Sequence, residues 1–431
     1  MTGIRKRDEL KQWVLASVVG AVAALAIISF RSLIHFIEFL GTGHKGGLVE
    51  AAMSLPPWHR AAVCTVGGLL AGATLQLGGA WAARGPRGDQ NLDYVEAARH
   101  GRVDLNDRTT LARTASALLS VGTGASIGRE GPMVQLAAWV SAWLAKLTTS
   151  VPEQRNVLMV CGIAAGIGSA YHAPLAGVVF FLELALGFFA RHTVAPLLIA
   201  SATASALMYW LVEPGPMYDL PAIPMAPIGL GIALLSGLVF GGIAWALIAL
   251  LDETRERFAR IHSLTLRLGL GGLLVGLLSA AVPQVWGNGF SVVSQVLQTT
   301  PPSQWLLMVL VAKVVATSCS SGSGAIGGVF TPSLFVGAVA GSLFAQIAAA
   351  WIPGLSVGPP QLFAILGMAA VLAAVTHAPL MAIVMVIEMT NQFQLALPVM
   401  LASGVAYAVS TRLGVRPLYG NPIEATNAKV A

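Results

Sequence analysis

The chain has 431 residues, of which 56% are hydrophobic and only 10% are charged, and its net charge is +6. Soluble domains carry about 25% charged residues, so this composition, with a mean hydropathy of +0.75, excludes a soluble domain and predicts an all-α polytopic membrane protein. The basic residues lie in segment ends and loops, where the positive-inside rule places them. We therefore expect a lipid bilayer as the surroundings and no nucleic acid as a partner.

The first part of the chain is a short charged tail followed by membrane segments. Residues 1–12 form the tail, which we expect to be cytoplasmic, and a long apolar segment follows at 13–40 without a clear signal-peptide cleavage site. Further spans are expected at 61–83, 192–212 and 221–251. Together they predict a first membrane repeat over residues 13–251.

A charged segment at 252–267 predicts a cytoplasmic linker between two halves. A second membrane repeat is expected at 268–412 and a short C-terminal segment at 413–431. Between Leu268 and Thr411 the only charged residues are Lys313 and Glu388. Prolines and glycines divide this stretch into pieces, many of them shorter than the roughly 17–25 residues of a straight crossing, so we predict many broken or tilted helices.

The two halves contain an internal repeat. The matching residues are His172 and His377, Pro174 and Pro379, and Glu183 and Glu388, each 205 positions apart, and Arg113 and Lys313, and Gly128 and Gly328, each 200 apart. Repeated halves are typical of transporter folds, which place the transported ion at the repeat interface near the middle of the membrane. A group that recurs in both halves is readily explained by shared architecture, for example by bonding to a neighbouring helix terminus, and the repeated histidines are interpreted in the same way.

Two charges have no charged counterpart in the repeat. Arg129 and Glu130 stand where the second half has Val329 and Phe330. Ionisable residues within the membrane are functional candidates by default, and this pair lies in a Gly128-Arg129-Glu130-Gly131-Pro132 run that interrupts two apolar segments. Irregular backbone at that depth occurs where it is buried in protein or lines a cavity, so we predict an ion-handling site here.

The chemistry of the site favours an anion. A cation pathway would use several acidic groups, whereas an anion can be held by backbone N–H groups at helix N-termini, which the glycine-rich stretches at 85–91, 128–131 and 327–330 can supply. Glu130 would then be a tethered anion that occupies an anion site when ionised and leaves it when protonated. The alternative is a salt bridge between Arg129 and Glu130 that stabilises the helix break, although adjacent helical residues do not face each other.

Two aromatic residues remain open to two interpretations. Phe330 either lines the anion path or is an ordinary core residue, and Tyr419 is either a hydroxyl donor to an anion or an aromatic anchor at the membrane interface. An intramembrane enzyme is not indicated, because there is no His-Glu-x-x-His motif and the serine-rich run from Ser318 to Ser323 has no buried base beside it. The three cysteines lack metal-ligand spacing, so we expect no metal and no cofactor.

Three motifs occur together in order: Gly128-Arg129-Glu130-Gly131-Pro132, Gly328-Val329-Phe330-Thr331-Pro332, and Pro417-Leu418-Tyr419. With them the chain resembles the CLC family of chloride channels and chloride/proton antiporters, in its bacterial form without regulatory domains. The resemblance implies a fold of two inverted repeats, a homodimer with one anion pathway per subunit, and a multi-pass protein of the bacterial inner membrane. It also implies chloride as the transported ion and a voltage-gated channel as one form of activity.

The resemblance also implies roles for single residues. Glu130 matches the external gating glutamate, the amides of Val329 and Phe330 match donors at the central chloride site, and Tyr419 matches the hydroxyl donor there. The remaining positions that we expect around the anion are Gly128, Arg129, Gly131 and Gly328. Arg113 and Arg129 match basic positions near the pathway.

Two departures from the family pattern matter. The first anion-binding loop falls near Gly88-Asp89-Gln90-Asn91 and has no serine, so we expect backbone amides or Asn91 as ligands there. The internal proton-transfer glutamate of the antiporters falls at Leu184, which cannot carry a proton. A chloride channel gated by Glu130 is therefore our first expectation, and an antiporter with another proton route is the alternative. Pro132 argues against fluoride selectivity.

Overall fold

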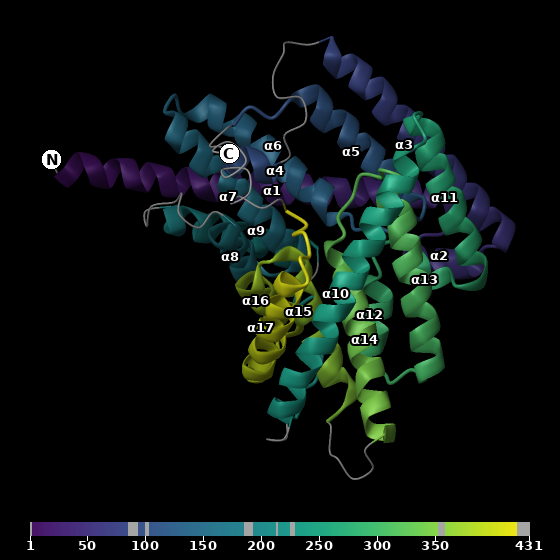
Figure 1. Ribbon diagram of the computed structural model, residues 1–431. Helices are drawn as coiled ribbons and strands as arrows, with labels where there is room; N and C mark the ends of the chain where they lie inside the picture. Colours follow the sequence, from purple (N-terminus) through teal and green to yellow (C-terminus); the bar gives the residue numbers. More distant parts are fainter. Residues whose placement is uncertain are drawn as a thin grey trace, which may run out of the picture.

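The computed structural model describes residues 2–84, 94–99, 103–184, 193–212, 214–224, 229–351 and 358–419. Within these ranges helices form nearly all of the regular structure, and the single β-type pairing is an isolated bridge between Gly128 and Gly328. Figure 1 shows a membrane-protein-like bundle in which the long helix α1 crosses behind the others and the helices of the second half lie side by side.

The first half of the chain forms a series of nine helices in its described ranges. They are α1 (Thr2–Thr42), α2 (Leu48–Ser54), α3 (Pro57–Ala83), α4 (Tyr94–Arg99), α5 (Asp107–Gly122), α6 (Glu130–Thr148), α7 (Pro152–Tyr171), α8 (Pro174–Leu184) and α9 (Val194–Leu211). Prolines begin α3 and α7, where the missing N–H costs no hydrogen bond. Asn106 caps α5 by accepting a hydrogen bond from the Thr109 amide at 3.1 Å.

The second half follows with a similar series. Its helices are α10 (Gly229–Ala259), α11 (Leu264–Ala281), α12 (Phe290–Gln298), α13 (Ser303–Gly322), α14 (Phe330–Trp351), α15 (Pro360–Thr376), α16 (Pro379–Thr390) and α17 (Ala396–Arg412), with 3-10 turns at Pro283–Val285 and Phe393–Leu395. His172 and His377 end α7 and α15 in the left-handed conformation, with φ of 53° and 56°. The repeated histidines thus have the same structural place, as their repetition predicts.

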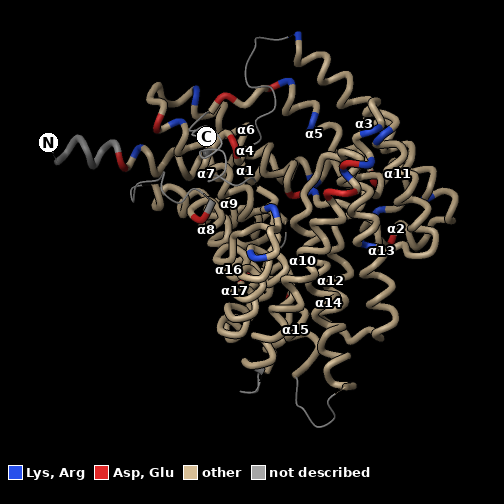
Figure 2. The backbone as a smooth tube through the Cα atoms, viewed as in Figure 1, with Lys and Arg blue, Asp and Glu red and all other residues tan. Residues whose placement is uncertain are grey.

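The helix lengths fit a multi-pass membrane protein. Eight helices of the described part are long and apolar enough to cross a membrane, while α8, α15 and α16 are apolar but shorter. This mixture of long and short helices is the one expected from the distribution of prolines and glycines. Figure 2 shows long stretches of α14, α15 and α17 without any charged residue.

The two halves share one pattern of helix packing. This pattern gives a boundary between the halves that differs from the one expected from the sequence. Helix α6 packs on α7 as α14 packs on α15, α7 packs on α9 as α15 packs on α17, and α1 packs on α9 as α10 packs on α17. Helix α10 is therefore the counterpart of α1, and the second half begins at Gly229 instead of after the expected linker at 252–267. The charged residues Asp252–Ala259 are the last turns of α10. The charged residues from Asp252 onward mark the point where α10 leaves the apolar environment. The helix continues past this point, and the boundary between the repeats does not lie at it.

A local two-fold relation joins the halves. Gly128 N–H donates to the Gly328 carbonyl and Gly328 N–H donates to the Gly128 carbonyl, both at 2.8 Å. When two equivalent residues bond to each other reciprocally, a two-fold axis passes between them. The halves are thus inverted around the Gly128–Gly328 bridge.

The repeated carboxylates obey the same two-fold relation. Glu183 of α8 accepts from the amides of Leu380 and Met381 at 3.0 and 2.8 Å. Glu388 of α16 accepts from Leu175 and Ala176 at the same two distances. Each carboxylate satisfies free N–H groups at the start of the other half's short helix, which is the bonding to a neighbouring helix terminus that the repetition suggests.

Candidate functional site

Glu130 is the first residue of α6, and its side chain is only 2% exposed. One carboxylate oxygen, Oε1, accepts a hydrogen bond from Asn288 Nδ2 at 2.7 Å. The other oxygen, Oε2, is buried and has no hydrogen-bond partner among the described residues. It lies against Gly128, where any side chain would overlap it. Glu130 is thus a buried acid with one oxygen held and one oxygen free.

The alternative explanation for the charge pair is a salt bridge between Arg129 and Glu130. In the part of the chain that the structure covers, no ion pair joins these two side chains. Arg129 is half-buried and precedes α6 as its N-cap without a side-chain capping bond. The two charges therefore do not neutralise each other directly.

Unpaired backbone amides converge beside Glu130. Helices α6 and α14 both begin at the Gly128–Gly328 bridge. Across the described ranges no hydrogen bond takes up the N–H groups of residues 129–131 or 329–331. The first N–H groups of a helix are left without intrahelical partners and carry the positive end of its dipole. Two such ends meet here, which makes a site for negative charge.

A small buried cavity lies at this junction. Its volume is about 20 Å³, and its lining residues are Tyr94, Glu130, Gly131, Val134, Ile167, Tyr171, Phe180, Gly328, Phe330 and Tyr419. That space is close to what one water molecule needs, so it suits a single small particle without its hydration shell. Of the sequence-predicted residues, the structure brings Glu130, Gly131, Gly328, Phe330 and Tyr419 to this cavity.

Tyr171 is a lining residue that sequence reasoning missed. Its ring packs against Phe330 with centroids 5.0 Å apart, and its hydroxyl is 3.3 Å from the Thr331 hydroxyl. The repeat contained a signal for it, because the position 205 residues further on is Thr376. Tyr171, like Glu130, therefore has a residue of a different type at the equivalent position of the second half.

A larger cavity of about 470 Å³ opens next to the small one. Tyr94, Gly131, Gly328 and Tyr419 line both cavities, so the two cavities are adjacent. Pro132 and Gln135 of α6 also line the larger cavity, and the Gln135 side-chain oxygen accepts from the Tyr94 amide at 2.9 Å. We call the larger cavity the vestibule.

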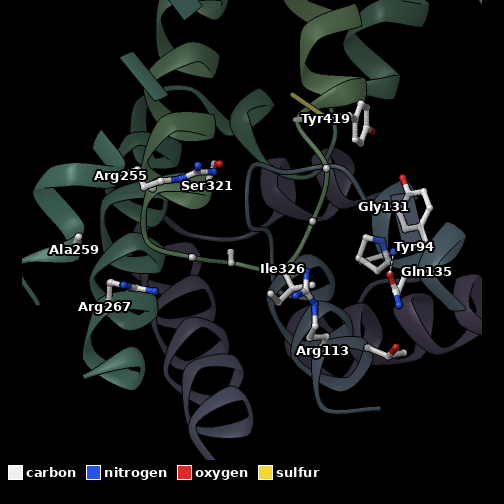
Figure 3. A pocket seen from close by; sticks show the side chains of 17 residues that line it. Tyr94, Arg113, Gly131, Gln135, Arg255, Ala259, Arg267, Ser321, Ile326 and Tyr419 are labelled. Atoms are coloured by element: carbon white, nitrogen blue, oxygen red, sulfur yellow. Dashed lines mark hydrogen bonds between the residues drawn. The ribbon is translucent and has the colours of Figure 1, made fainter. Parts of the chain in front are cut away.

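Three arginines from three helices line the vestibule. Arg113 comes from α5, Arg255 from the end of α10 and Arg267 from α11, and no acidic residue is among the described lining residues. Figure 3 shows Arg255 and Arg267 on one side, Arg113 beside Ile326, and Tyr94, Gln135 and Tyr419 on the other side. Arg113, which the sequence placed near the pathway as a hypothesis, thus lines the vestibule, whereas Arg255 and Arg267 were assigned to the linker alone. Arg255 and Arg267 lie far from Arg113 along the chain, so the sequence alone does not show that the three arginines line one cavity.

Lys313, the counterpart of Arg113, has a different environment. It is fully buried, and its Nζ donates to the carbonyls of Val285 and Gly287 at 3.1 and 2.6 Å and lies 5.5 Å from the centre of the Phe335 ring. The inverted relation of the halves explains the difference, because equivalent positions on α5 and α13 fall on opposite sides of the junction. Arg113 faces the vestibule and Lys313 supports a turn near Glu130.

Tyr218 lies in the segment between α9 and α10, outside the candidate spans. Its hydroxyl is buried and has no hydrogen-bond partner among the described residues. Burial raises the pKa of Tyr218 well above its ordinary value, and the negative charge of Glu130 adds to the rise. The Tyr218 hydroxyl therefore stays protonated at neutral pH.

Two expectations cannot be compared with the structure. The first-loop residues Gly88 to Asn91 lie outside the described residues. Leu184 is the last residue of α8, and its side chain is likewise outside what is described. The first-loop ligand and the absence of an internal proton carrier at position 184 therefore stay predictions.

Comparison with known proteins gives a family. The profile of the voltage gated chloride channel family matches residues 67–411. The chain belongs to the CLC family. A ClcB-like chloride channel protein of Ralstonia nicotianae is 44% identical, and the match covers 95% of this chain and 96% of the relative. The voltage-gated ClC-type chloride channel ClcB of Citrobacter koseri is 36% identical, over 95% of this chain and 98% of the relative.

Solved structures show the same fold. A slow cyanobacterial Cl⁻/H⁺ antiporter aligns with a TM-score of 0.83 at 24% identity, covering 97% of this chain and 98% of that one. A CLC-type fluoride/proton antiporter aligns with a TM-score of 0.75, also at 24% identity, covering 94% and 96%. The chain is thus a multi-pass CLC membrane protein with two inverted repeats, of a family of chloride transporters and channels.

Proposed function

We propose that the chain is a chloride channel in which Glu130 is the gate. The observation that carries this proposal is the place of the Glu130 carboxylate, which is buried at the junction where the free amides of α6 and α14 converge. A carboxylate and a chloride ion need the same surroundings there, namely N–H donors and the positive ends of two helices. They therefore compete for one place.

The path on one side of the gate runs through the vestibule. Arg113, Arg255 and Arg267 raise the local concentration of anions at a distance. An ion then passes Tyr419 and reaches the amides of Val329 and Phe330, which replace part of its hydration shell. Amide dipoles without a full cationic partner bind weakly enough for the ion to leave again, as conduction requires.

The gate operates through the charge of Glu130. An ionised carboxylate occupies the anion place and blocks it, and a protonated one leaves the place to chloride. Lowering the pH on the side from which protons reach Glu130 therefore increases chloride flux. A charge that moves within the membrane also senses the membrane potential, so the gating is voltage dependent.

A chloride/proton antiporter is the second candidate. Tyr171 favours it, because its hydroxyl lies in the same cavity as Glu130 and is within hydrogen-bond distance of Thr331. Phenol and hydroxyl groups of this kind can pass a proton onward. The solved structures with the same fold that are named above are antiporters, whereas the curated relatives are named as channels.

The test is reconstitution of the purified protein into liposomes with a chloride gradient and no other permeant ion. The channel predicts chloride efflux that stops until a potassium ionophore removes the membrane potential, with no proton movement against its gradient. Uphill proton movement driven by chloride would replace the channel by the antiporter. Absence of chloride flux under both conditions would contradict both candidates.

We further propose a homodimer in the bacterial inner membrane. Exposed leucines lie on four helices that include matching pairs of the two halves: Leu175 of α8 and Leu380 of α16, which are equivalent in the repeat, at 50% and 60% exposed, and Leu198 of α9 and Leu397 of α17 at 40% and 52%. Together these four helices offer one apolar face that a second copy can cover. Cross-linking of the reconstituted protein, with a dimer as the expected species, tests this assembly.

A further inference from the structure

A tight turn at Gly287-Asn288-Gly289 lies over the Glu130 carboxylate. The two glycines have positive φ angles of 68° and 95°, which glycine adopts without the penalty that other residues have. A side chain at Gly289 would also overlap the ring of Phe335. The turn is thus closely packed, and Asn288 is the only one of its three residues that is not glycine.

Both ends of the Asn288 side-chain amide are engaged. Its Oδ1 accepts from the Phe290 amide at 3.1 Å and its Nδ2 donates to Glu130 Oε1 at 2.7 Å. The backbone N–H of Phe290 can only donate, so the oxygen of Asn288 must face it and the NH₂ group must face Glu130. The orientation of the amide is therefore fixed by its two partners.

The turn is held in place from the core. Lys313 Nζ donates to the Gly287 carbonyl at 2.6 Å and to the Val285 carbonyl at 3.1 Å. On the other side the ring of Phe290 stacks on Tyr218 with centroids 5.2 Å apart, and the Tyr218 amide donates to the Met389 carbonyl at 2.8 Å. A buried cation and an aromatic stack thus fix the position from which Asn288 reaches Glu130.

We propose that Asn288 is a latch, a positioning residue that holds the ionised Glu130 carboxylate in the closed position of the gate. The inference rests on the proposed gating role of Glu130. A side-chain NH₂ group only donates, so it binds the ionised carboxylate better than the neutral acid, whose oxygens are weaker acceptors. Among the described residues it is also the only hydrogen-bond donor to either carboxylate oxygen. Loss of the latch therefore weakens the closed state selectively.

Other titratable groups act on the same carboxylate, and Asn288→Ala leaves them unchanged. Those that interact with Glu130 are Lys313 of α13, Tyr171 of α7 and Tyr218 of the α9–α10 segment. Of the further helices packed on α6, α5 carries Arg113 in the vestibule, α1 carries Glu38 with His35 at 3.2 Å, and α4 carries Glu96.

The experiment compares Asn288→Ala and Asn288→Asp with wild type by chloride efflux from liposomes as a function of pH. Asn288→Asp keeps the acceptor for the Phe290 amide and removes the donor, so the turn is preserved while the latch is lost. Asn288→Ala is expected to move the pH of half-maximal flux upward by about one unit, and to raise flux at neutral pH by about tenfold, as loss of a charge-assisted hydrogen bond predicts. Asn288→Asp is expected to move it further in the same direction, because its carboxylate also repels the ionised Glu130. Asn391→Asp, an exposed turn residue, is the matched control and is expected to behave as wild type.

The Glu130→Gln background separates the latch from the gate. There Asn288→Ala is expected to change flux by less than about twofold, since the charge that the latch holds is absent. A pH midpoint that stays in place in both Asn288 variants, or equal flux changes in both backgrounds, would overturn the latch while leaving the gate intact. If Glu130→Gln itself keeps the wild-type pH dependence, the gate has failed, and this outcome is seen without any change at Asn288.

Discussion

The two loops that meet at the centre of the molecule have the same backbone and different side chains. Residues 123–129 and 323–329 follow equivalent helices, pass through Gly124 and Gly324 with φ of 95° and 91°, and pair through Gly128 and Gly328. The first loop leads to Glu130 and the second to Phe330. Gly124 packs on Trp286, whereas Gly324 packs on the guanidinium of Arg267. Symmetric residues thus build the junction, and asymmetric residues give one side the buried acid Glu130, which we propose as the gate, and the other a basic vestibule.

The largest expected effect follows from removing the asymmetric charge. Glu130→Gln keeps the size of the side chain but cannot ionise, so the anion place is no longer closed by a carboxylate. We expect chloride flux that no longer depends on pH and equals or exceeds the wild-type flux at acidic pH. Efflux measured over a pH series checks this, with Glu388→Gln as the control that keeps wild-type pH dependence.

A second prediction breaks the symmetric part of the junction. In Gly128→Ala the added methyl group would overlap Glu130 Oε2 and lie about 2.8 Å from the Gly328 carbonyl oxygen, so the bridge and the amides around it must shift. We expect chloride flux to fall by about tenfold or more, since displaced donors no longer converge on one ion. Gly404→Ala in α17, where the methyl group meets nothing within 4 Å, is the matched control. Unchanged flux in Gly128→Ala would contradict the proposed ion path.

The third prediction compares the two repeated carboxylates. Glu183→Gln and Glu388→Gln each weaken two charge-assisted bonds to the amides of a helix N-terminus, and we expect each to lower the free energy of unfolding by about 1–3 kcal/mol. Because the bonding is reciprocal, the two losses should agree closely. Thermal unfolding in detergent measures them. A loss of unfolding free energy in only one variant would show that the two symmetric contacts do not contribute equally to stability.

The smallest effect is expected in the vestibule. Arg255→Gln and Arg267→Gln remove charges that attract anions through solvent, so we expect flux at low ionic strength to fall by about threefold. At about 1 M salt the screening length is near 3 Å and the difference should vanish. Flux measured at both ionic strengths checks this, and a loss that persists at high salt would indicate a structural role, for which the Arg267 bond to the Ser323 carbonyl at 2.9 Å is the reason to look.

Much of the fold was accessible from the sequence. The spacing of Gly128 and Gly328, and of Glu183 and Glu388, revealed that the chain contains two repeated halves. That the halves are inverted was implied by the family resemblance, and the reciprocal bonds between Gly128 and Gly328 show it. The boundary between the halves was not accessible from the sequence, because α10 continues beyond its apolar part into Asp252–Ala259. Apolar composition reports what surrounds a segment, and only the packing of α10 on α17 shows which half it completes.

The site was predictable only in its asymmetric charge. Glu130 stood out because an acid without a counterpart in a glycine-rich break is costly in a membrane. Asn288 and Arg255 gave no such signal, because an asparagine in a glycine turn and an arginine after an apolar segment are ordinary in sequence. Their roles arise from contacts between helices more than a hundred residues apart along the chain, which no local pattern encodes. Tyr171 lies between these cases, since its asymmetry with Thr376 was visible.

The central claim is that an anion and the Glu130 carboxylate compete for the junction of α6 and α14. The most direct measurement is anomalous scattering from crystals of Glu130→Gln and of wild type grown at neutral pH in bromide, a heavier substitute for chloride. We expect a bromide peak beside the amides of residues 129–131 and 329–331 in Glu130→Gln and none at that place in wild type. Bromide at the same place in both proteins, or in neither, would contradict the competition and with it the gate.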